Sequence, residues 1–291
     1  MNEYLTTREL AELLRIKERK VYDLASSGAV PCSRATGKLL FPRDAIQSWI
    51  AQNASGTLTS EPASRAKVIL GSHDPLLEWA IRESRCGLAS YFDSSLDGLK
   101  RFASAEGLAS GLHVYDSESN SWNRAVIEER FAQQPVVLVA WAKRQRGIIF
   151  NPDNQKSMMQ LSDLVGTQVI PRQAEAGSQV LLNTLLDKER INTDQVNWLT
   201  PARSEVDAVL AVQEGKADAT FGLASLATQY NLEFAPVIEE HFDLLVDRKA
   251  WFEPCWQSLL AFCRSPAFKQ RADELAGYDI DDLLRVRFNG G

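Results

Sequence analysis

The chain begins with two short segments in which apolar residues recur every three or four positions, as on one face of a helix. The first segment starts at Thr7, which we interpret as its N-cap, and the second covers residues 18–27 and stops at Gly28. The inward-facing positions of both segments are apolar: Leu10, Leu13, Leu14, Val21, Leu24 and Ala25. The pattern predicts two adjacent helices joined by a turn at residues 15–17.

The hydrophobic pattern changes after Gly28. Residues 29–34 and 39–41 read as two short strands around a tight turn, and a third helix is predicted from Pro42 to Ile50. Helix, turn, helix, a small two-stranded wing and a closing helix follow one another within about 50 residues. This order predicts a winged helix-turn-helix over residues 1–53.

The outer face of this unit carries basic and hydroxyl side chains suited to DNA. We predict contacts with DNA from Thr7, Arg15, Lys17, Arg19, Lys20, Tyr22, Arg34 and Lys38. Arg19, Lys20 and Tyr22 lie on the predicted recognition helix, whereas Arg34 and Lys38 lie on the wing and are expected at the DNA backbone or minor groove. The alternative to DNA binding is that the two helices bind a protein partner. One such module buries little surface, so a homodimer or higher oligomer on double-stranded operator DNA is expected.

Residues 54–66 lack periodicity and read as a linker, and residues 67–291 then alternate between strands and helices. The predicted strands are residues 66–71, 88–91, 112–115, 136–142, 148–151 and 168–171. Helices are expected to open at residues 72–75, at 94–99 and at 177. Strand followed by helix, repeated in two units, predicts parallel pairing with crossover helices.

Polar residues gather where these strands end and helices begin, which is where α/β sheets bind ligands. Our candidate ligand-binding residues are Ser72, His73, Ser94, Ser95, His113, Tyr115, Arg172, Gly177 and Ser178. Free helix N–H groups, hydroxyls and one arginine form a neutral-to-positive site, which predicts a small anion as the ligand.

Charge separates the two parts of the chain. The formal net charge is -6 over 291 residues, but residues 1–56 hold eight Lys/Arg and six Asp/Glu, which leaves -8 for the rest.

The four cysteines are far apart, so neither a zinc site nor a disulfide framework is predicted, and reduced thiols indicate the cytoplasm. No signal peptide or membrane span is expected, and neither a metal nor a cofactor. The chain lacks a G-x-S-x-G elbow, a phosphate loop and a G-x-G-x-x-G motif, so we predict that it is not an enzyme.

Two family resemblances follow from these stretches. "LTTRELAELL", "VYDLASSGAVP" and "LLFPRDAIQSWI" resemble the excisionase and MerR-like DNA-binding domains. The stretches "GSHDPLLEWA", "SSLDGLKRFASAEGLASGLHVYD", "RQAEAGSQVLL", "EVDAVLAVQEGKADATFGLAS" and "LEFAPVIEEHFDLLV" resemble periplasmic-binding-protein-like domains fused to helix-turn-helix modules, which are relatives of molybdate and tungstate binders. The second resemblance implies a two-lobed (type II) domain that closes on its ligand, with Ser72, Ser95, Arg172 and Ser178 lining the cleft.

The fold class predicted is therefore α/β, with an N-terminal winged helix-turn-helix and a two-lobed periplasmic-binding-protein-like domain at residues 67–291. We expect a ligand-responsive transcriptional regulator whose sensor domain binds an oxyanion such as molybdate or tungstate. A small carboxylate or a sulfur-containing anion is the alternative ligand. An enzyme on a bilobed fold and an excisionase-like architectural DNA-binding factor are the alternative functions.

Overall fold

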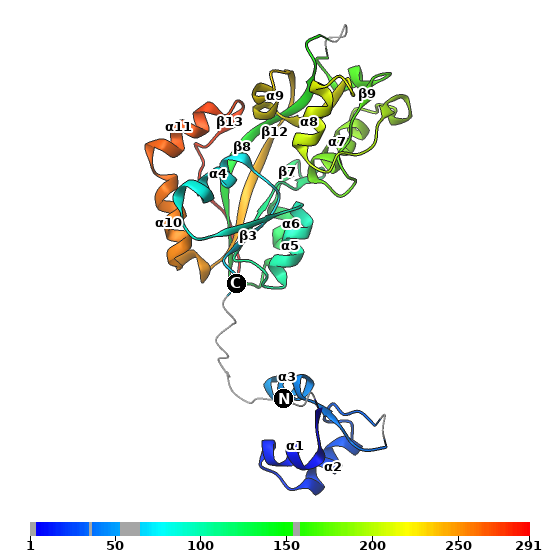
Figure 1. The fold of residues 1–291 in the computed structure, drawn as a ribbon, viewed down its shortest axis with the longest axis vertical. Helices are drawn as coiled ribbons and strands as arrows, with labels where there is room; N and C mark the ends of the chain where they lie inside the picture. Colours follow the sequence, from blue (N-terminus) through cyan, green and yellow to red (C-terminus); the bar gives the residue numbers. More distant parts are fainter. Residues whose placement is uncertain (1–3, 35–36, 53–64, 154–157) are drawn as a thin grey trace. The chain divides into compact units, whose positions relative to one another are not determined.

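The computed structural model describes residues 4–34, 37–52, 65–153 and 158–291 (Figure 1). Contacts divide the chain into two compact units, residues 1–64 and 65–291. Most of the predicted linker lies outside the described residues. Arg65, which we assigned to that linker, belongs to the second unit, where its Nε donates to Oδ2 of Asp247 at 3.0 Å. Within the described ranges, no helix has the length and apolar character needed to cross a membrane.

The first unit contains the helix-turn-helix. Its elements are β1 (Tyr4–Leu5), α1 (Thr7–Leu14), α2 (Glu18–Ser26), β2 (Phe41–Pro42) and α3 (Arg43–Gln52). The N-cap of α1 is Thr6 and not Thr7: Oγ1 of Thr6 accepts the Glu9 N–H at 3.3 Å, and Oε2 of Glu9 accepts the Thr6 N–H at 2.7 Å. This reciprocal capping box makes Thr7 the first residue of the helix.

The wing is smaller than predicted. Residues 29–34 form no strand; one isolated bridge joins Ser33 to Leu40, and β2 pairs antiparallel with β1. Pro31 lacks the N–H that a strand ladder needs, which accounts for the missing strand. Residues 35 and 36 of the predicted turn lie outside the described residues. Of the predicted inward positions, Leu10, Val21 and Ala25 are buried in one core, Leu14 and Leu24 pack against it partly buried, and Leu13 is exposed.

The second unit alternates helices with the strands of one large sheet. Its first half comprises β3 (Val68–Gly71), α4 (Pro75–Ser84), β4 (Ala89–Phe92), α5 (Ser95–Ala103), β5 (Ala109–Leu112), β6 (Tyr115–Asp116), β7 (Ser121–Trp122), α6 (Arg124–Phe131) and β8 (Val136–Phe150). The second half comprises β9 (Gln168–Val169), α7 (Gly177–Lys188), β10 (Asn197–Trp198), α8 (Glu205–Gln213), β11 (Ala219–Leu223), α9 (Ala224–Gln229), β12 (Glu233–Asp247), α10 (Pro254–Cys263), α11 (Pro266–Glu274), β13 (Tyr278–Asp279) and β14 (Val286–Asn289). Short 3-10 turns lie at Leu161–Leu164, Thr193–Gln195 and Ala250–Phe252.

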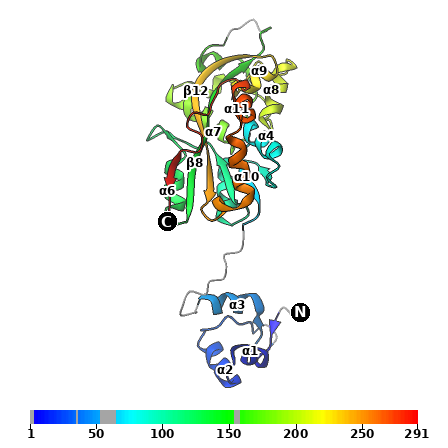
Figure 2. The same cartoon turned by 90° about the vertical axis from the view of Figure 1, so that its left-hand side faces the viewer.

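Two long strands join the halves of the sheet, whose order is β10-β9-β11-β8-β12-β5-β3-β4. β8 and β12 pair antiparallel along most of their 15 residues (Figure 2), whereas β3, β4 and β5 pair parallel at one end and β9, β10 and β11 at the other. The sheet is therefore mixed rather than parallel throughout. The strands predicted separately at 136–142 and 148–151 are one strand, because the intervening polar residues Arg144 and Arg146 are buried against β12.

Three strand or helix boundaries also differ from prediction. The strand expected at 112–115 ends at Leu112, and Tyr115–Asp116 pairs with β7 in a separate hairpin. The strand expected at 168–171 ends at Val169, two residues before Pro171, which has no N–H to donate. Asp74, and not Ser72 or His73, caps α4, since its Oδ1 accepts the Leu77 N–H at 2.7 Å.

Helices cover both faces of the sheet at each end, which gives two lobes. The first lobe, residues 65–142 and 242–291, packs α4, α10 and α11 on one face and α5 and α6 on the other. The second lobe, residues 148–238, packs α7 on one face and α8 and α9 on the other. β8 and β12 thus run through both lobes, and residues 143–147 and 239–241 form the hinge region between them.

Candidate functional site

A narrow cavity lies where the first lobe meets α7 of the second lobe. Its volume is about 40 Å³, and its lining residues are Ser95, Leu96, His113, Val114, Tyr115, Glu175, Gly177, Val180, Leu181 and Thr184. Four of the predicted ligand-binding residues, Ser95, His113, Tyr115 and Gly177, are therefore brought together. We call this space the interlobe cavity.

The hydroxyl of Ser95, a lining residue of the interlobe cavity, is paired with that of Ser72, a buried residue outside the lining. Oγ of Ser72 lies 2.8 Å from Oγ of Ser95, and Oγ of Ser95 also accepts the His113 N–H at 3.1 Å. This packing depends on a glycine, since a Cβ at Gly98 would lie 2.3 Å from the Gly71 Cα. The close approach of α5 to β3 brings Ser95 next to Ser72.

The starts of two helices contribute to the lining. α5 begins at Ser95, and its N-cap Ser94 accepts the Asp97 N–H at 3.2 Å. α7 begins at Gly177 and has no side-chain cap. The first N–H groups of a helix have no partner within the helix and lie at its positive end. The first residues of α5 and α7 both line the cavity, an arrangement suited to an anion.

His113 connects the interlobe cavity to the hinge region. A Cβ at position 177 would lie 2.9 Å from its Cε1, so Gly177 allows the ring to pack against the start of α7. On the other side, Nδ1 of His113 lies 2.9 Å from Oε2 of Glu240. This contact is an ion pair when the imidazole is protonated.

Glu240 belongs to a group of charges that spans both lobes, which we call the hinge network: Asp74, Arg144, Arg146, Glu205 and Glu240. All are buried except Glu205, which is partly exposed. Both arginines donate to the Glu240 carboxylate, with Nε of Arg146 at 2.7 Å from Oε2. Arg144 also donates to Asp74 in the first lobe at 2.9 Å, and Arg146 to Glu205 of α8 in the second lobe at 2.7 Å. Burial alone would raise the pKa of Glu240, but the positive charges of Arg144 and Arg146 outweigh it and hold the pKa well below its ordinary value.

Sequence reasoning missed the hinge network. The available signal was the alternation of Arg144 and Arg146, which places both side chains on one face of a strand, and a pair of glutamates at 239–240 in a distant segment. The charged run at 143–146 was interpreted as a break between strands, and that interpretation hid the pairing.

The other predicted ligand-binding residues lie outside the lining of the interlobe cavity. Nε2 of His73 lies 2.9 Å from Oε2 of Glu78 at the exposed start of α4. The guanidinium of Arg172 donates to the carbonyls of Ala202 and Arg203, at 3.2 and 2.8 Å. Ser94 serves as the α5 cap, and Ser178 is buried in the first turn of α7.

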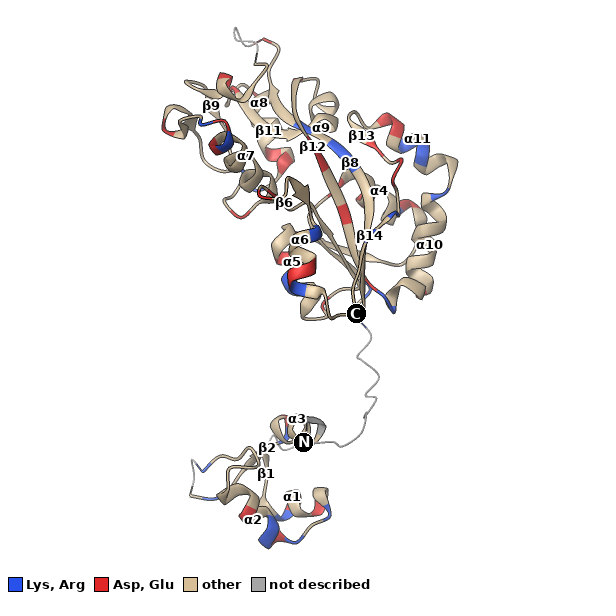
Figure 3. Cartoon of the chain, turned by 180° about the vertical axis from the view of Figure 1, so that it is seen from behind, with Lys and Arg blue, Asp and Glu red and all other residues tan. Residues whose placement is uncertain are grey.

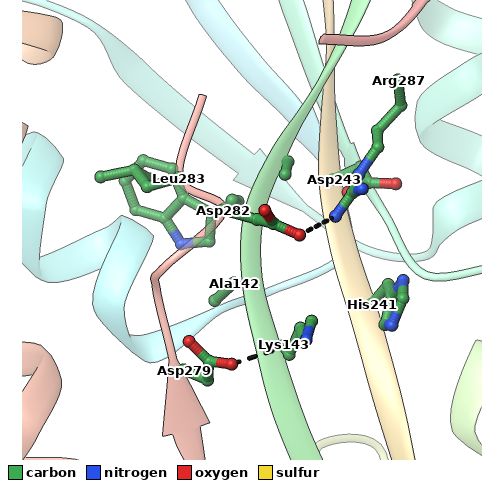
Figure 4. Close-up of a pocket in the computed structure, with 10 residues that line it drawn as sticks. Ala142, Lys143, His241, Asp243, Asp279, Asp282, Leu283 and Arg287 are labelled. Carbon is green, nitrogen blue, oxygen red and sulfur yellow. Dashed lines mark hydrogen bonds and ion pairs between the residues drawn. The ribbon is translucent and has the colours of Figure 1, made fainter. Parts of the chain in front are cut away.

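A second, smaller cavity lies between strands β8 and β12 and the C-terminal residues 279–287 (Figure 4). Asp243 is buried there and accepts a hydrogen bond from Nδ2 of Asn123 at 2.7 Å. Oδ1 of Asn123 in turn accepts the N–H of Val114, a lining residue of the interlobe cavity, at 2.6 Å. Burial raises the pKa of Asp243 to about 6. Over the described ranges, no group of three or more His, Cys, Asp or Glu side chains is arranged to hold a metal ion.

The first unit presents the residues predicted to contact DNA along α2 and the segment after it. Arg15, Lys17, Arg19, Lys20, Tyr22, Arg34 and Lys38 are all exposed, whereas Thr7 is half-buried. Figure 3 marks the Lys and Arg positions of α2 in blue along the ribbon. A groove of about 430 Å³ lies between α2 and residues 34 and 37–39, with Tyr22, Ser26, Arg34 and Lys38 among its lining residues. Arg34 is fastened to α2, since its Nη2 donates to the Ala25 carbonyl at 3.2 Å.

Comparison with known proteins assigns both units to families. Residues 78–264 match the PBP superfamily domain, and residues 4–54 match a helix-turn-helix domain. An uncharacterized protein of Bacillus subtilis (strain 168), YvgK, is 25% identical over 295 residues that cover 94% of each chain. An uncharacterized protein of Clostridium pasteurianum, described as lying in the ferredoxin 2Fe-2S gene 5' region, is 25% identical over 84 residues, 28% of this chain and 74% of its own.

A solved structure supports the fold of the second unit. The regulatory domain of MetR, a LysR family regulator from N. meningitidis, matches with a TM-score of 0.52 and 13% sequence identity, over 73% of this chain and 96% of that domain. At this identity the likeness establishes the periplasmic-binding-protein fold alone. A helix-turn-helix domain thus precedes a two-lobed sensor-type fold, and the chain belongs to the PBP superfamily domain family.

Proposed function

We propose that this protein is a transcriptional regulator that binds a small oxyanion, with molybdate or tungstate favoured, in the interlobe cavity and changes its affinity for operator DNA in response. The domain pair itself, a helix-turn-helix followed by a periplasmic-binding-protein-like domain, fits a ligand-responsive DNA-binding regulator. The choice of ligand rests on the chemistry of the cavity.

The observation that carries the proposal is the buried hydroxyl of Ser95, which lines the interlobe cavity together with Gly177 at the start of α7 and is paired with Ser72. Hydroxyls and helix N–H groups donate hydrogen bonds without adding a full charge, and such donors suit an anion that must shed its water. A cavity of about 40 Å³ also favours a compact ligand over an extended one. The resemblance of this region to molybdate and tungstate binders agrees with both points.

DNA binding is proposed to use α2 and the adjacent groove, with Arg19, Lys20 and Tyr22 at the bases or phosphates and Arg34 and Lys38 at the backbone. Because one such unit covers little DNA, we propose that two copies of the chain bind a two-fold operator. Closure of the lobes around the ligand would then alter the spacing of the two DNA-binding units.

The test is a panel of anions measured by thermal shift and titration calorimetry: molybdate, tungstate, sulfate, thiosulfate, phosphate and small carboxylates. We expect molybdate or tungstate to bind most tightly, and to change the affinity for DNA selected in vitro with the same protein. Preference for a carboxylate or for thiosulfate would replace the proposed ligand class. Recovery of a chemically altered ligand would indicate an enzyme, and DNA bending that ignores every ligand would indicate an architectural factor.

A further inference from the structure

Two large apolar side chains are exposed at the interlobe cavity, one from each lobe. Leu96 lies in the first turn of α5 and is 44% exposed, and Val180 lies in the first turn of α7 and is 47% exposed. Both line the same cavity of about 40 Å³. Single exposed apolar residues are ordinary on protein surfaces, but these two belong to the two walls of one narrow space. A small movement of either wall would bury both.

The two helices use other side chains to pack within their own lobes. α5 contributes Phe102 to the core of the first lobe, and α7 contributes Leu182 and Leu186 to the core of the second lobe. Leu96 and Val180 lie on the cavity side of their helices. Nearly half of each residue's surface therefore remains in water in this arrangement of the lobes.

An apolar contact across the lobe boundary is already present beside this pair. Tyr115 follows the first-lobe strand β5 and lines the interlobe cavity, and its side chain packs against the apolar core of the second lobe. Trp122, the neighbour of Tyr115 in the hairpin, packs against that core too, and the two ring centroids lie 5.1 Å apart. A closer approach of α5 and α7 would extend this interlobe apolar contact to Leu96 and Val180.

We propose that Leu96 and Val180 come into contact when the lobes close on the anion, and that this contact holds the closed state without touching the ligand. The inference rests on the proposed function and concerns how the same site gains affinity. Burial of apolar surface needs no charge, so it can stabilise the closed state although the described lining residues of the cavity include neither lysine nor arginine. Leu96 and Val180 are thus positioning residues for the closed state.

Truncation of either side chain should weaken ligand binding. Leu96→Ala and Val180→Ala should each lower the affinity for molybdate by about three- to tenfold, because each removes part of the apolar surface that closure buries. The double variant should lose less than the product of the two single losses, since either truncation breaks the same contact. Leu96→Met, which keeps the apolar bulk, should retain the affinity. The matched control is Val286→Ala, which truncates an exposed valine outside the cavity lining and should bind molybdate as wild type does.

The experiment is titration calorimetry of the full-length protein with molybdate, tungstate and sulfate at several temperatures. We expect each variant to lose affinity by the same factor for every anion that binds, because the contact is between the lobes and not with the ligand. We also expect a negative heat-capacity change of binding in the wild-type protein. Both alanine variants should show a smaller change, since closure then buries less apolar surface.

Wild-type affinity together with a wild-type heat-capacity change in Leu96→Ala and Val180→Ala would overturn this inference and leave the proposed function intact. A loss that differs from one anion to another would also overturn it, because the two side chains would then contact the ligand itself. If none of the three anions binds to the wild-type protein, the proposed function fails and this inference fails with it.

Discussion

At the scale of single residues, we expect Ser95 to contribute both to stability and to ligand binding, whereas its neighbour Ser94 should contribute to stability alone. Its hydroxyl accepts the buried His113 N–H and contacts Ser72, whereas Ser94 only caps α5. Ser95→Ala should lower the free energy of unfolding by about 1–3 kcal/mol, because the His113 N–H loses its acceptor. It should also weaken molybdate binding by about 0.5–1.5 kcal/mol. Urea unfolding and titration calorimetry measure the two effects.

Ser94→Ala is the matched control for that substitution. Loss of an N-cap should cost about 1 kcal/mol of stability, and molybdate affinity should stay at the wild-type value. An equal loss of affinity in both variants would show that Ser95 acts through the stability of α5 and not through the ligand.

Asp243 gives the stability of the second unit a pH dependence. Burial raises its pKa to about 6, above the ordinary value of 3.8, so the folded protein binds this proton more tightly than the unfolded chain. The stabilisation is complete below pH ~4 and is lost as the pH rises to about 6, at up to about 1.4 kcal/mol per pH unit. Asp243→Asn should lack this contribution. Urea unfolding at pH 4, 5, 6 and 8 should therefore show the variant gaining on wild type up to about pH 6 and not beyond. A constant difference would contradict the assignment.

Several cavity residues were predictable from the sequence because their positions follow from local rules. Ser95 and Gly177 begin helices, and His113 follows a strand, so the general geometry of α/β sheets brings them together. His73 and Arg172 obey the same local rule, yet their side chains pair with Glu78 and with the 202–203 carbonyls. Which partner a side chain takes depends on contacts between distant segments, and these are not visible in the local pattern.

At the scale of elements, β8 and β12 show where sequence patterns fail. The 15-residue strand β8 contains Arg144 and Arg146, and in the sequence these charged residues look like a polar break between two strands. They can be buried in one strand only because their partner Glu240 lies almost 100 residues away on β12. The helices of the first unit and the starts of α4, α5 and α7 were easier to predict, since apolar spacing and helix starts are local features. The prediction of the first strand of the wing was wrong for a local reason, because Pro31 lies within the expected strand.

The free energy of unfolding should be sensitive to the loss of a single charge from the hinge network on β8 and β12. Arg146→Met removes two hydrogen bonds to Glu240 and the link to Glu205, and leaves buried carboxylates with less compensation. We expect the free energy of unfolding to fall by about 3–5 kcal/mol, the range for one broken partner of a buried pair. The control is Arg101→Gln, which breaks the partly exposed pairs with Asp97 and Glu106 and should change stability less. Similar effects of both substitutions, in urea unfolding followed by tryptophan fluorescence, would contradict this account.

The recognition helix α2 should govern DNA affinity through its exposed basic residues. Lys20→Ala should weaken operator binding by about 1–3 kcal/mol if Lys20 reads a base, or lower the salt dependence by about one released ion if it contacts phosphate. Lys249→Ala, which removes an exposed lysine of the second unit, should leave both quantities unchanged. Mobility shifts at several salt concentrations measure both. An unchanged Lys20→Ala protein would place the DNA contact on another element.

At the scale of the whole molecule, charge is divided unevenly along the chain. Residues 1–56 carry a net charge of +2 and the remainder -8, so the proposed function places the attraction for DNA in the N-terminal part. An acidic protein can bind a polyanion in this way, because the local field at the contact matters more than the global sum of charges.

The two units, if coupled as proposed, must obey a reciprocal relation. When molybdate changes the DNA affinity by some factor, operator DNA must change the molybdate affinity by the same factor, which is typically about 5- to 150-fold for allosteric proteins. We expect these two factors to agree when DNA binding is titrated with and without molybdate and molybdate binding with and without DNA. Lys20→Ala should keep the wild-type molybdate affinity in the absence of DNA, and Ser95→Ala should keep the basal DNA affinity while a higher molybdate concentration is needed for the response. Unequal factors in the wild-type protein would mean that the two ligands do not act on one shared equilibrium.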